Sequence, residues 1–251
     1  MKKIFPRITT RGFYDLVTGK TIVKSSYRLY PKKKFDELAN SKELTIVIHG
    51  LRNNSSGALS KFIIAQKRLK NLKYSHDVIG FSYDSNTYGI QYNTHSIHAL
   101  NVGIIIAQKN GKNLAKFITD FKNKSPSTKI RLIGHSLGTH VILNTIIYLA
   151  KQSKNNGIIE SVHFFGGSIP NDSLQPKNFG NYAKNVIRSK IKNYYSPFDE
   201  VLAIADDKNW VITPIGYKGA VGRTISKYSE ILVKPKNHRF ASYATTLKSF
   251  P

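Results

Sequence analysis

The sequence predicts a three-layer α/β/α sandwich, in which helices cover both faces of a mostly parallel sheet and no large cap domain is present. Short apolar runs of strand length alternate with segments whose apolar residues recur at helical spacing. Repeated strand–helix–strand units of this kind form parallel sheets. The chain has 251 residues, 40% of them hydrophobic, and no internal repeat or linker divides it. We therefore expect residues 1–251 to form a single domain.

The expected strands are continuous apolar runs, as is typical of strands that are buried on both faces. In order, they are Leu44–Ile48, Asp77–Tyr83, Lys129–Ile133, Ile158–Phe165 and Lys190–Tyr195, with Ser229–Val233 as a last candidate. Before them, Thr21–Val23 and Tyr27–Tyr30 favour short strands. Glycine and polar residues, as in Val17–Lys20, predict turns between these segments.

The expected helices carry apolar residues three and four positions apart. They are Ala58–Leu72, Ile97–Phe121 with an interruption near Asn110 and Gly111, Leu137–Lys151, Phe179–Arg188 and the short Glu200–Ala205. A glycine-rich loop is expected over Pro214–Gly222. Sites in such sheets form where the parallel strands end. The loops at His49, Tyr83, His135, Gly166 and Pro197 are therefore expected to share one edge, where functional residues are expected.

Residues Gly134–Gly138 form a G-x-S-x-G motif with Ser136 at its centre. The motif lies directly between an expected strand and an expected helix, which is the context of a nucleophile elbow. Small residues on both sides of the serine permit the tight turn. The turn also places the serine at a helix N-terminus, where backbone N–H groups favour negative charge. We expect Ser136 to be a nucleophile, and the alternative is a tight turn with an inert serine.

A serine hydroxyl needs a base, and in this arrangement the acid and then the histidine follow the serine along the chain. His238 is the only histidine beyond residue 188, so it is the expected base. Asp199 lies in the first loop after the fifth strand and is expected to orient the imidazole, with Glu200 and Asp172 as reserves. Asp199 also suits a different role, the N-cap of the helix that follows it.

The other histidines have ordinary interpretations. His135 is next to the serine and is expected to pack around the turn, whereas His140 and His163 fall inside a helix and a strand. His95 and His98 share a helix face, but without nearby carboxylates they favour a surface position over a metal site. We therefore expect no metal.

An oxyanion formed at Ser136 requires two backbone donors. The first is expected to be the N–H of Leu137, the residue after the nucleophile. The second is expected to come from His49–Arg52, the loop after the first long strand, where Gly50 permits close approach and Leu51 supplies the N–H. Two such groups each contribute a few kcal/mol to transition-state stabilisation.

With these features the chain resembles the α/β-hydrolase superfamily from about Leu44 to His238. The stretches that carry the resemblance are Val47–Asn53, Gly80–Ser85, Gly134–Gly138, Ser161–Gly167, Tyr195–Leu202 and Asn237–Arg239. More narrowly, the chain is similar to an uncharacterised branch common among archaea, which implies no particular substrate. The superfamily implies a hydrolase without metal or cofactor, usually carboxylesterase- or lipase-like, whose Ser, acid and His correspond to Ser136, Asp199 and His238. Tyr83 stands where a Trp is commoner in the superfamily, and this difference does not affect the expected catalytic residues.

Substrate contacts are expected from side chains on the same edge. The candidates are Tyr83, Phe198 and His49, with Tyr88 and Phe165 as further lining residues of an apolar acyl pocket. A place in the core is an equally good interpretation of Phe165. The connection between the fourth and fifth strands is too short for a large helical cap. We therefore expect an open site, or one roofed by loops such as Gly166–Gly180 and Asp206–Lys236.

The chain is strongly basic, with 39 Lys and Arg against 14 Asp and Glu and a formal net charge of +25. The lysines are dispersed, and the densest cluster, Lys32–Lys34, is short. A solvated surface is one interpretation, and attraction for anionic substrates or a membrane surface is the other. We expect a small-molecule acyl substrate and no specific nucleic acid. The alternatives to an enzyme are a catalytically silent binding module of the same fold, or a basic protein that binds anionic surfaces or nucleic acid.

Composition also excludes several classes of protein. With no cysteine, the chain has no disulfide, thiol nucleophile or cysteine-ligated metal. Its apolar runs are shorter than the roughly 20 residues that span a bilayer. The segment Met1–Arg7 is basic but is not followed by the apolar region of a secretory signal. A soluble cytoplasmic protein is therefore the expectation.

Overall fold

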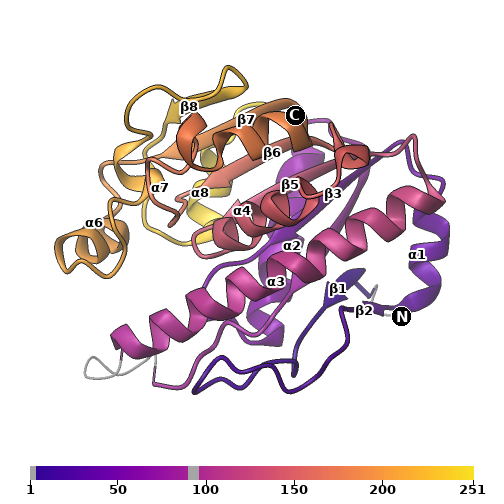
Figure 1. Cartoon of the computed structure of the whole chain (residues 1–251), viewed down its shortest axis with the longest axis horizontal. Coiled ribbons are helices and arrows are strands. Elements are labelled where there is room, and N and C mark those ends of the chain that lie inside the picture. Colours follow the sequence, from indigo (N-terminus) through magenta and orange to yellow (C-terminus); the bar gives the residue numbers. More distant parts are fainter. Residues whose placement is uncertain (1–3, 90–95) are drawn as a thin grey trace.

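The computed structural model describes residues 4–89 and 96–251, which form a three-layer α/β/α sandwich (Figure 1). Within these residues an eight-stranded sheet has the order β2-β1-β4-β3-β5-β6-β7-β8. The strands are β1 (Arg7–Thr9), β2 (Arg28–Tyr30), β3 (Glu43–Ile48), β4 (Asp77–Ser82), β5 (Lys129–His135), β6 (Ile159–Phe165), β7 (Ile187–Tyr195) and β8 (Tyr228–Leu232). Neighbouring strands pair in parallel, except for the edge strand β2, which is antiparallel to β1. This confirms the expected fold class.

Helices cover both faces of the sheet. They are α1 (Lys32–Leu38), α2 (Ser55–Asn71), α3 (Ser96–Lys124), α4 (Gly138–Leu149), α5 (Asn181–Val186), α6 (Glu200–Asp207), α7 (Ile215–Lys218) and α8 (Phe240–Thr246). Helices α3 and α4 pack against each other on one face, and α2 and α8 pack together on the other (Figure 1). No helix within residues 4–89 and 96–251 combines the length and the apolar character needed to cross a membrane.

Two apolar cores lie on the two faces of the sheet, and β3 contributes to both. Ile46 and Ile48 belong to the core that includes Val141 of α4, whereas Val47 belongs to the core that includes Phe62 of α2. Successive strand residues point to opposite faces, so a strand covered on both sides can bury apolar side chains at consecutive positions. This is the physical reason that the central strands appear in the sequence as continuous apolar runs.

Helix α3 runs without interruption through Asn110 and Gly111, so the expected break there is wrong. A Cβ on Gly111 would lie 2.3 Å from Cβ of Asn144, which belongs to α4. Asn110 is buried and its side chain donates to the carbonyl of Ile106 at 2.8 Å. The glycine therefore allows two helices to approach closely and does not end either of them.

The segments that the sequence did not predict are short. Strand β1, helix α1 and helix α8 have three, seven and seven residues, too few for a periodic pattern to stand out. Thr21 forms only an isolated bridge to Tyr14, so Thr21–Val23 is not a strand. The helix expected over Phe179–Arg188 is cut short, because Ile187 already begins β7.

Candidate active site

Ser136 lies in the sharp turn between β5 and α4, with φ at 51°. Non-glycine residues rarely adopt this left-handed region, so the turn holds the serine in a strained conformation. Gly138 is required sterically, because a Cβ there would lie 2.6 Å from the carbonyl oxygen of Ile48; a Cβ on Gly134 would lie 2.6 Å from Cδ1 of Ile142, which would have to move. The geometry is that of a nucleophile elbow.

The side chains of Ser136, His238 and Asp199 form one hydrogen-bonded chain. Nε2 of His238 lies 2.9 Å from Oγ of Ser136, and Nδ1 of His238 lies 2.7 Å from Oδ2 of Asp199. Ser136 follows β5, Asp199 follows β7, and His238 lies between β8 and α8, so the parallel sheet brings all three loops to one edge. The imidazole keeps slight solvent exposure, and the carboxylate is completely buried.

Asp199 has two roles in the structure. Its Oδ1 accepts a hydrogen bond from the backbone N–H of Leu202 at 3.2 Å, which caps α6, and its Oδ2 faces His238. Burial would raise the pKa of Asp199, but the hydrogen bonds from His238 and others lower it below its usual value. Asp199 is therefore an ionised acceptor. Neither reserve takes this place, since Asp172 is bonded to Asn178 and Glu200 is exposed in the first turn of α6.

Tyr243 completes the surroundings of Asp199, and the sequence analysis missed it. Its hydroxyl, carried on α8, donates to Oδ2 of Asp199 at 2.5 Å, and the residue is fully buried. Burial, followed by the Asp199 charge, raises the pKa of Tyr243, so the phenol stays neutral and remains a donor. The only signal in the sequence is an aromatic residue shortly after His238, which is too weak to identify this contact.

The ring of His135 packs against the ring of His238. It is buried, and its ring centroid lies 5.0 Å from that of His238. Its Nε2–H donates to the backbone carbonyl of His238 at 2.8 Å. Burial lowers the pKa of His135 to about 3, so the ring is neutral. His135 thereby fixes the backbone that carries the candidate base.

The loop after β3 approaches the elbow closely. A Cβ on Gly50 would lie 2.9 Å from Cβ of Ser136. The carbonyl of Gly50 accepts hydrogen bonds from Nδ2 of Asn53 at 3.1 Å and from Nδ1 of His49 at 2.9 Å. In a trans peptide the following N–H is antiparallel to that carbonyl, so the Leu51 N–H points away from Asn53. The Leu137 N–H lies at the start of α4, directly after the serine.

A cavity of about 450 Å³ opens at Ser136. Its wall is mainly apolar, and includes Leu51, Leu100, Leu137, Val201, Ile204 and Trp210. Arg52 and Lys208 add positive charge to the wall. Pockets of roughly 300–1,000 Å³ accommodate small-molecule ligands. The cavity therefore has the size and character to hold an apolar chain beside the serine.

The residues expected to contact substrate do not line the cavity. For Tyr83 and His49 the expectation is wrong, because both side chains belong to the core. Both are almost completely buried, and their rings stack on each other with centroids 4.5 Å apart. Phe165 is also in the core, whereas Phe198 and Tyr88 are exposed and lie outside the cavity wall. The sequence identified the correct edge of the sheet, but it did not reveal which side chains point into the core.

Tyr83 and His49 instead support the loop after β3. The hydroxyl of Tyr83 donates to the carbonyl of His49 at 3.1 Å, and the backbone N–H of Tyr83 donates to Nε2 of His49 at 3.2 Å. Burial lowers the pKa of His49 to about 3, which leaves the ring neutral and able to accept this bond. The pair holds the loop that carries Leu51 against the elbow.

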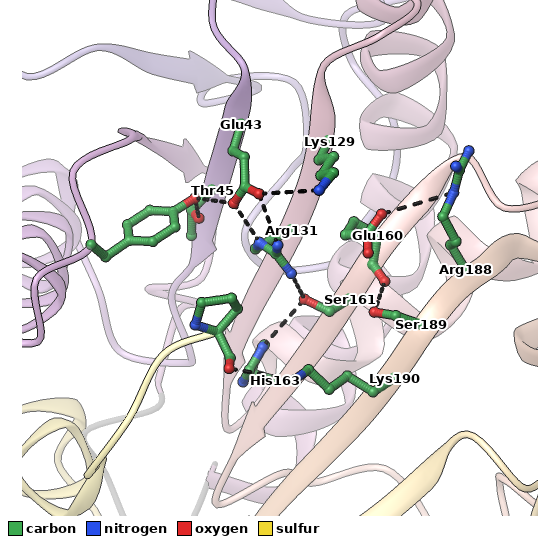
Figure 2. A network of polar contacts seen from close by, with 12 residues as sticks. Glu43, Thr45, Lys129, Arg131, Glu160, Ser161, His163, Arg188, Ser189 and Lys190 are labelled. Atoms are coloured by element: carbon green, nitrogen blue, oxygen red, sulfur yellow. Dashed lines mark hydrogen bonds and ion pairs between the residues drawn. The ribbon is translucent and has the colours of Figure 1, made fainter.

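Three further histidines make structural contacts. Buried His163 lies beside Ser161, which accepts a hydrogen bond from Arg131, within the polar network shown in Figure 2. This network centres on the ion pair of Arg131 with Glu43, near the amino-terminal ends of the strands and away from Ser136. Nε2–H of His140 donates to the carbonyl of Ser168 at 3.0 Å. His98 bonds to the backbone of the loop after β1, and His95 lies outside the described residues.

Comparison with known proteins identifies the family. The family model described as alpha/beta hydrolase of unknown function (DUF900) matches residues 32–216. This chain therefore belongs to that family of α/β hydrolases. The matched segment contains Ser136 and Asp199 and ends before His238. Among curated proteins, none matches this chain.

Three solved structures illustrate the similarity. A cutinase-like protein from Cryptococcus sp. has 14% identity and a TM-score of 0.35, over 76% of this chain and 75% of that one. A lipase-esterase related protein from Clostridium acetobutylicum ATCC 824 has 11% identity and a TM-score of 0.42, over 83% and 90%. Trichoderma reesei cutinase in complex with a C11Y4 phosphonate inhibitor has 17% identity and a TM-score of 0.34, over 62% and 73%.

Proposed function

We propose that this chain is a serine hydrolase that cleaves carboxylic esters through an acyl-enzyme. Ser136 is the nucleophile, His238 the general base and Asp199 the acid that orients the imidazole. The observation that carries the proposal is the position of His238, 2.9 Å from the serine oxygen and 2.7 Å from the carboxylate. Both distances are within the reach required for proton transfer and for orientation of the base. Membership of an α/β-hydrolase family supports hydrolysis as the class of reaction.

In the first half-reaction, Nε2 of His238 accepts the proton of the Ser136 hydroxyl as the oxygen attacks the acyl carbon. The carbonyl oxygen becomes an oxyanion, which the N–H groups of Leu137 and Leu51 bind. The tetrahedral intermediate collapses, the alcohol leaves with the proton from His238, and Ser136 carries the acyl group. In the second half-reaction a water molecule gives a proton to His238 as its oxygen attacks the acyl carbon. The bond between that carbon and Oγ of Ser136 then breaks, His238 returns the proton to the serine oxygen, and the carboxylic acid is released.

The surroundings of Asp199 suit this cycle. His238 becomes positively charged in each transition state, and an ionised carboxylate at Nδ1 stabilises that charge. The lowered pKa of Asp199, which burial alone would raise but the bonds from His238 and Tyr243 depress, keeps the carboxylate ionised near neutral pH. Tyr243 and Leu202 both donate to this carboxylate, so its orientation is fixed before substrate binds.

The cavity indicates the kind of ester. Its apolar wall, formed by residues such as Leu51, Leu137, Val201 and Ile204, suits an aliphatic or aromatic acyl chain. Burying each methylene of such a chain contributes about 0.8 kcal/mol to binding. We therefore expect kcat/KM to rise with acyl-chain length from acetate until the chain fills the cavity.

The first prediction concerns the nucleophile. A fluorophosphonate probe should label the parent protein and not the Ser136→Ala variant, because only an activated serine attacks the phosphorus. The same variant should lose about 10⁴-fold or more of its p-nitrophenyl butyrate hydrolysis. Circular dichroism of the variant should match that of the parent.

Two results would contradict the proposal. Hydrolysis by Ser136→Ala at the parent rate would exclude Ser136 as the nucleophile. A folded parent protein that neither reacts with the probe nor hydrolyses any ester in an acetate-to-octanoate panel would favour the alternative of a catalytically silent binding module.

A further inference from the structure

Exposed apolar side chains gather near the cavity, on the segment that follows β7. Phe198, Val201, Ile204 and Ile212 are 62%, 53%, 50% and 74% exposed. Figure 1 shows that α6, which carries Val201 and Ile204, projects from the body of the molecule. Single exposed apolar residues are ordinary on protein surfaces, but a group of large ones in one short segment marks an interaction surface.

A second group of exposed apolar side chains lies on the loops after β1 and β4. Val17, Ile22 and Tyr88 are 47%, 63% and 70% exposed. These loops are neighbours, because the backbone N–H of Tyr88 donates to the carbonyl of Leu16 at 3.0 Å. Strands β1, β4 and β7 are parallel and β5 lies between them, so the two groups lie on the same edge as Ser136, on opposite sides of it. We call the seven residues of the two groups the apolar rim.

The apolar rim continues into the cavity. Val201 and Ile204 are half exposed and also form part of the wall that leads to Ser136. Leu51 and Leu137 line the same cavity close to the serine. An acyl chain can therefore pass from the outer surface to the serine along apolar side chains.

The charge of the protein indicates what kind of surface the apolar rim would bind. The net charge of +25 attracts the whole molecule to an anionic surface, although α6 itself carries Glu200, Asp206 and Asp207. Nζ of Lys234 lies 5.4 Å from the ring centroid of Phe198, and Nζ of Lys208 lies 4.9 Å from that of Trp210. Lysine beside an aromatic ring suits a bilayer interface, where the stem is buried and the ammonium group reaches the headgroups. Two copies of this chain would repel each other.

We propose that the apolar rim docks on a bilayer that contains anionic lipids and that the substrate enters the cavity from that bilayer. The apolar side chains insert among the acyl chains, and the lysines remain at the level of the headgroups. The docking surface does not depend on catalysis. Only the use of bilayer-resident esters rests on the proposed function.

Vesicle sedimentation of the Ser136→Ala protein tests the docking without hydrolysis. We expect it to sediment with vesicles of equal parts phosphatidylcholine and phosphatidylserine, to bind pure phosphatidylcholine vesicles far more weakly, and to be released by added salt. Ile212→Glu in this background should weaken binding by roughly tenfold or more, because an apolar anchor becomes a charge. Ile4→Glu is the matched control: Ile4 is 52% exposed and precedes β1, at the opposite edge of the sheet, and its replacement should change binding little.

The outcomes separate docking from catalysis. Absence of binding to the anionic vesicles, or an equal loss in the two glutamate variants, overturns the docking proposal. A dimer that Ile212→Glu dissociates would assign the apolar rim to self-association instead. With Ser136 intact, Ile212→Glu should hydrolyse water-soluble p-nitrophenyl acetate at the parent rate and lose activity on esters presented in anionic vesicles. A parent that binds vesicles but hydrolyses no soluble ester would refute the proposed function and leave the docking surface standing.

Discussion

Asp199 connects the candidate triad to the wall of the cavity. One carboxylate oxygen caps α6 through the N–H of Leu202, and the other receives His238 and Tyr243. Because Val201 and Ile204 belong to α6, the residue proposed to orient the base also holds one wall in place. The sequence allowed either role for Asp199, and the structure shows that the geometry of both is present at once.

Tyr243 is expected to be a positioning residue. Tyr243→Phe removes one donor from the Asp199 carboxylate, leaving the pKa of Asp199 higher and its orientation less fixed. We expect kcat to fall by roughly 10- to 100-fold, in keeping with the 1.5–3 kcal/mol of a hydrogen bond to a charged group. KM for a p-nitrophenyl ester should stay unchanged, because the phenol does not line the cavity.

Tyr228 provides the matched control. Tyr228 is half-buried and its hydroxyl donates to a carboxylate, Glu230, at 2.8 Å, but it lies on β8 outside the cavity wall. Tyr228→Phe should therefore leave kcat at the parent value. An equal fall in kcat in the two variants would show that Tyr243 acts only through general stability.

At the scale of elements, α3 packs closely against α4, the helix that follows the serine. Helix α4 begins two residues after Ser136, and its packing against α3 passes through Gly111, where a Cβ would lie 2.6 Å from the backbone carbon of Asn144. In sequence terms a glycine beside an asparagine predicts an interruption. In the folded protein Gly111 does not interrupt α3, because its lack of a side chain allows α3 and α4 to approach closely.

Gly111→Ala is therefore expected to destabilise the protein by about 1–3 kcal/mol, as overpacking does. This would occur although alanine favours a helix over glycine by about 1 kcal/mol. Urea unfolding followed by circular dichroism measures the change. Lys112→Ala, at the exposed neighbouring position, should alter stability by less than about 0.5 kcal/mol. A Gly111→Ala protein more stable than the parent would disprove the proposed close packing.

The central strands and the long helices were predictable, because the strands form continuous apolar runs and the helices repeat apolar residues at helical spacing. Helix α8 and strand β1 could not be predicted, because α8 has only seven residues and β1 only three. Helix α6 was predicted as an element, but not as a wall of the cavity. Its position depends on the chain after it folding back, with the N–H of Trp210 donating to Ala205 at 2.8 Å.

At the scale of the whole molecule, half of the eight histidines are deeply buried and neutral. Burial lowers the pKa of His49, His135 and His163 to about 3 and that of His140 to about 4. In the unfolded chain these groups titrate near about 6.5. Below that pH the unfolded state binds protons that the folded state does not. Their contribution to stability is therefore complete above about pH 6.5 and is lost progressively as the pH falls towards 3.

Acid should destabilise this protein well before its carboxylates titrate. Each of the four histidines contributes up to about 1.4 kcal/mol per pH unit below its unfolded pKa, so the free energy of unfolding should fall by roughly 4–6 kcal/mol between pH 7.5 and 5.5. Urea titrations at the two pH values measure this change. His140→Gln should reduce the fall by about a quarter. An unchanged unfolding midpoint would contradict the burial of these rings as neutral groups.

The sequence alone determined the three-layer fold and the order in which Ser136, Asp199 and His238 follow their strands. Both are properties of the order of elements, which apolar periodicity and one five-residue motif record directly. Only the tertiary structure decided that Tyr243 reaches Asp199, that Tyr83 and His49 are buried, and that α6 forms the wall beside Ser136. These features depend on contacts between segments far apart in the chain, and on the depth to which each side chain is buried. A single sequence records neither.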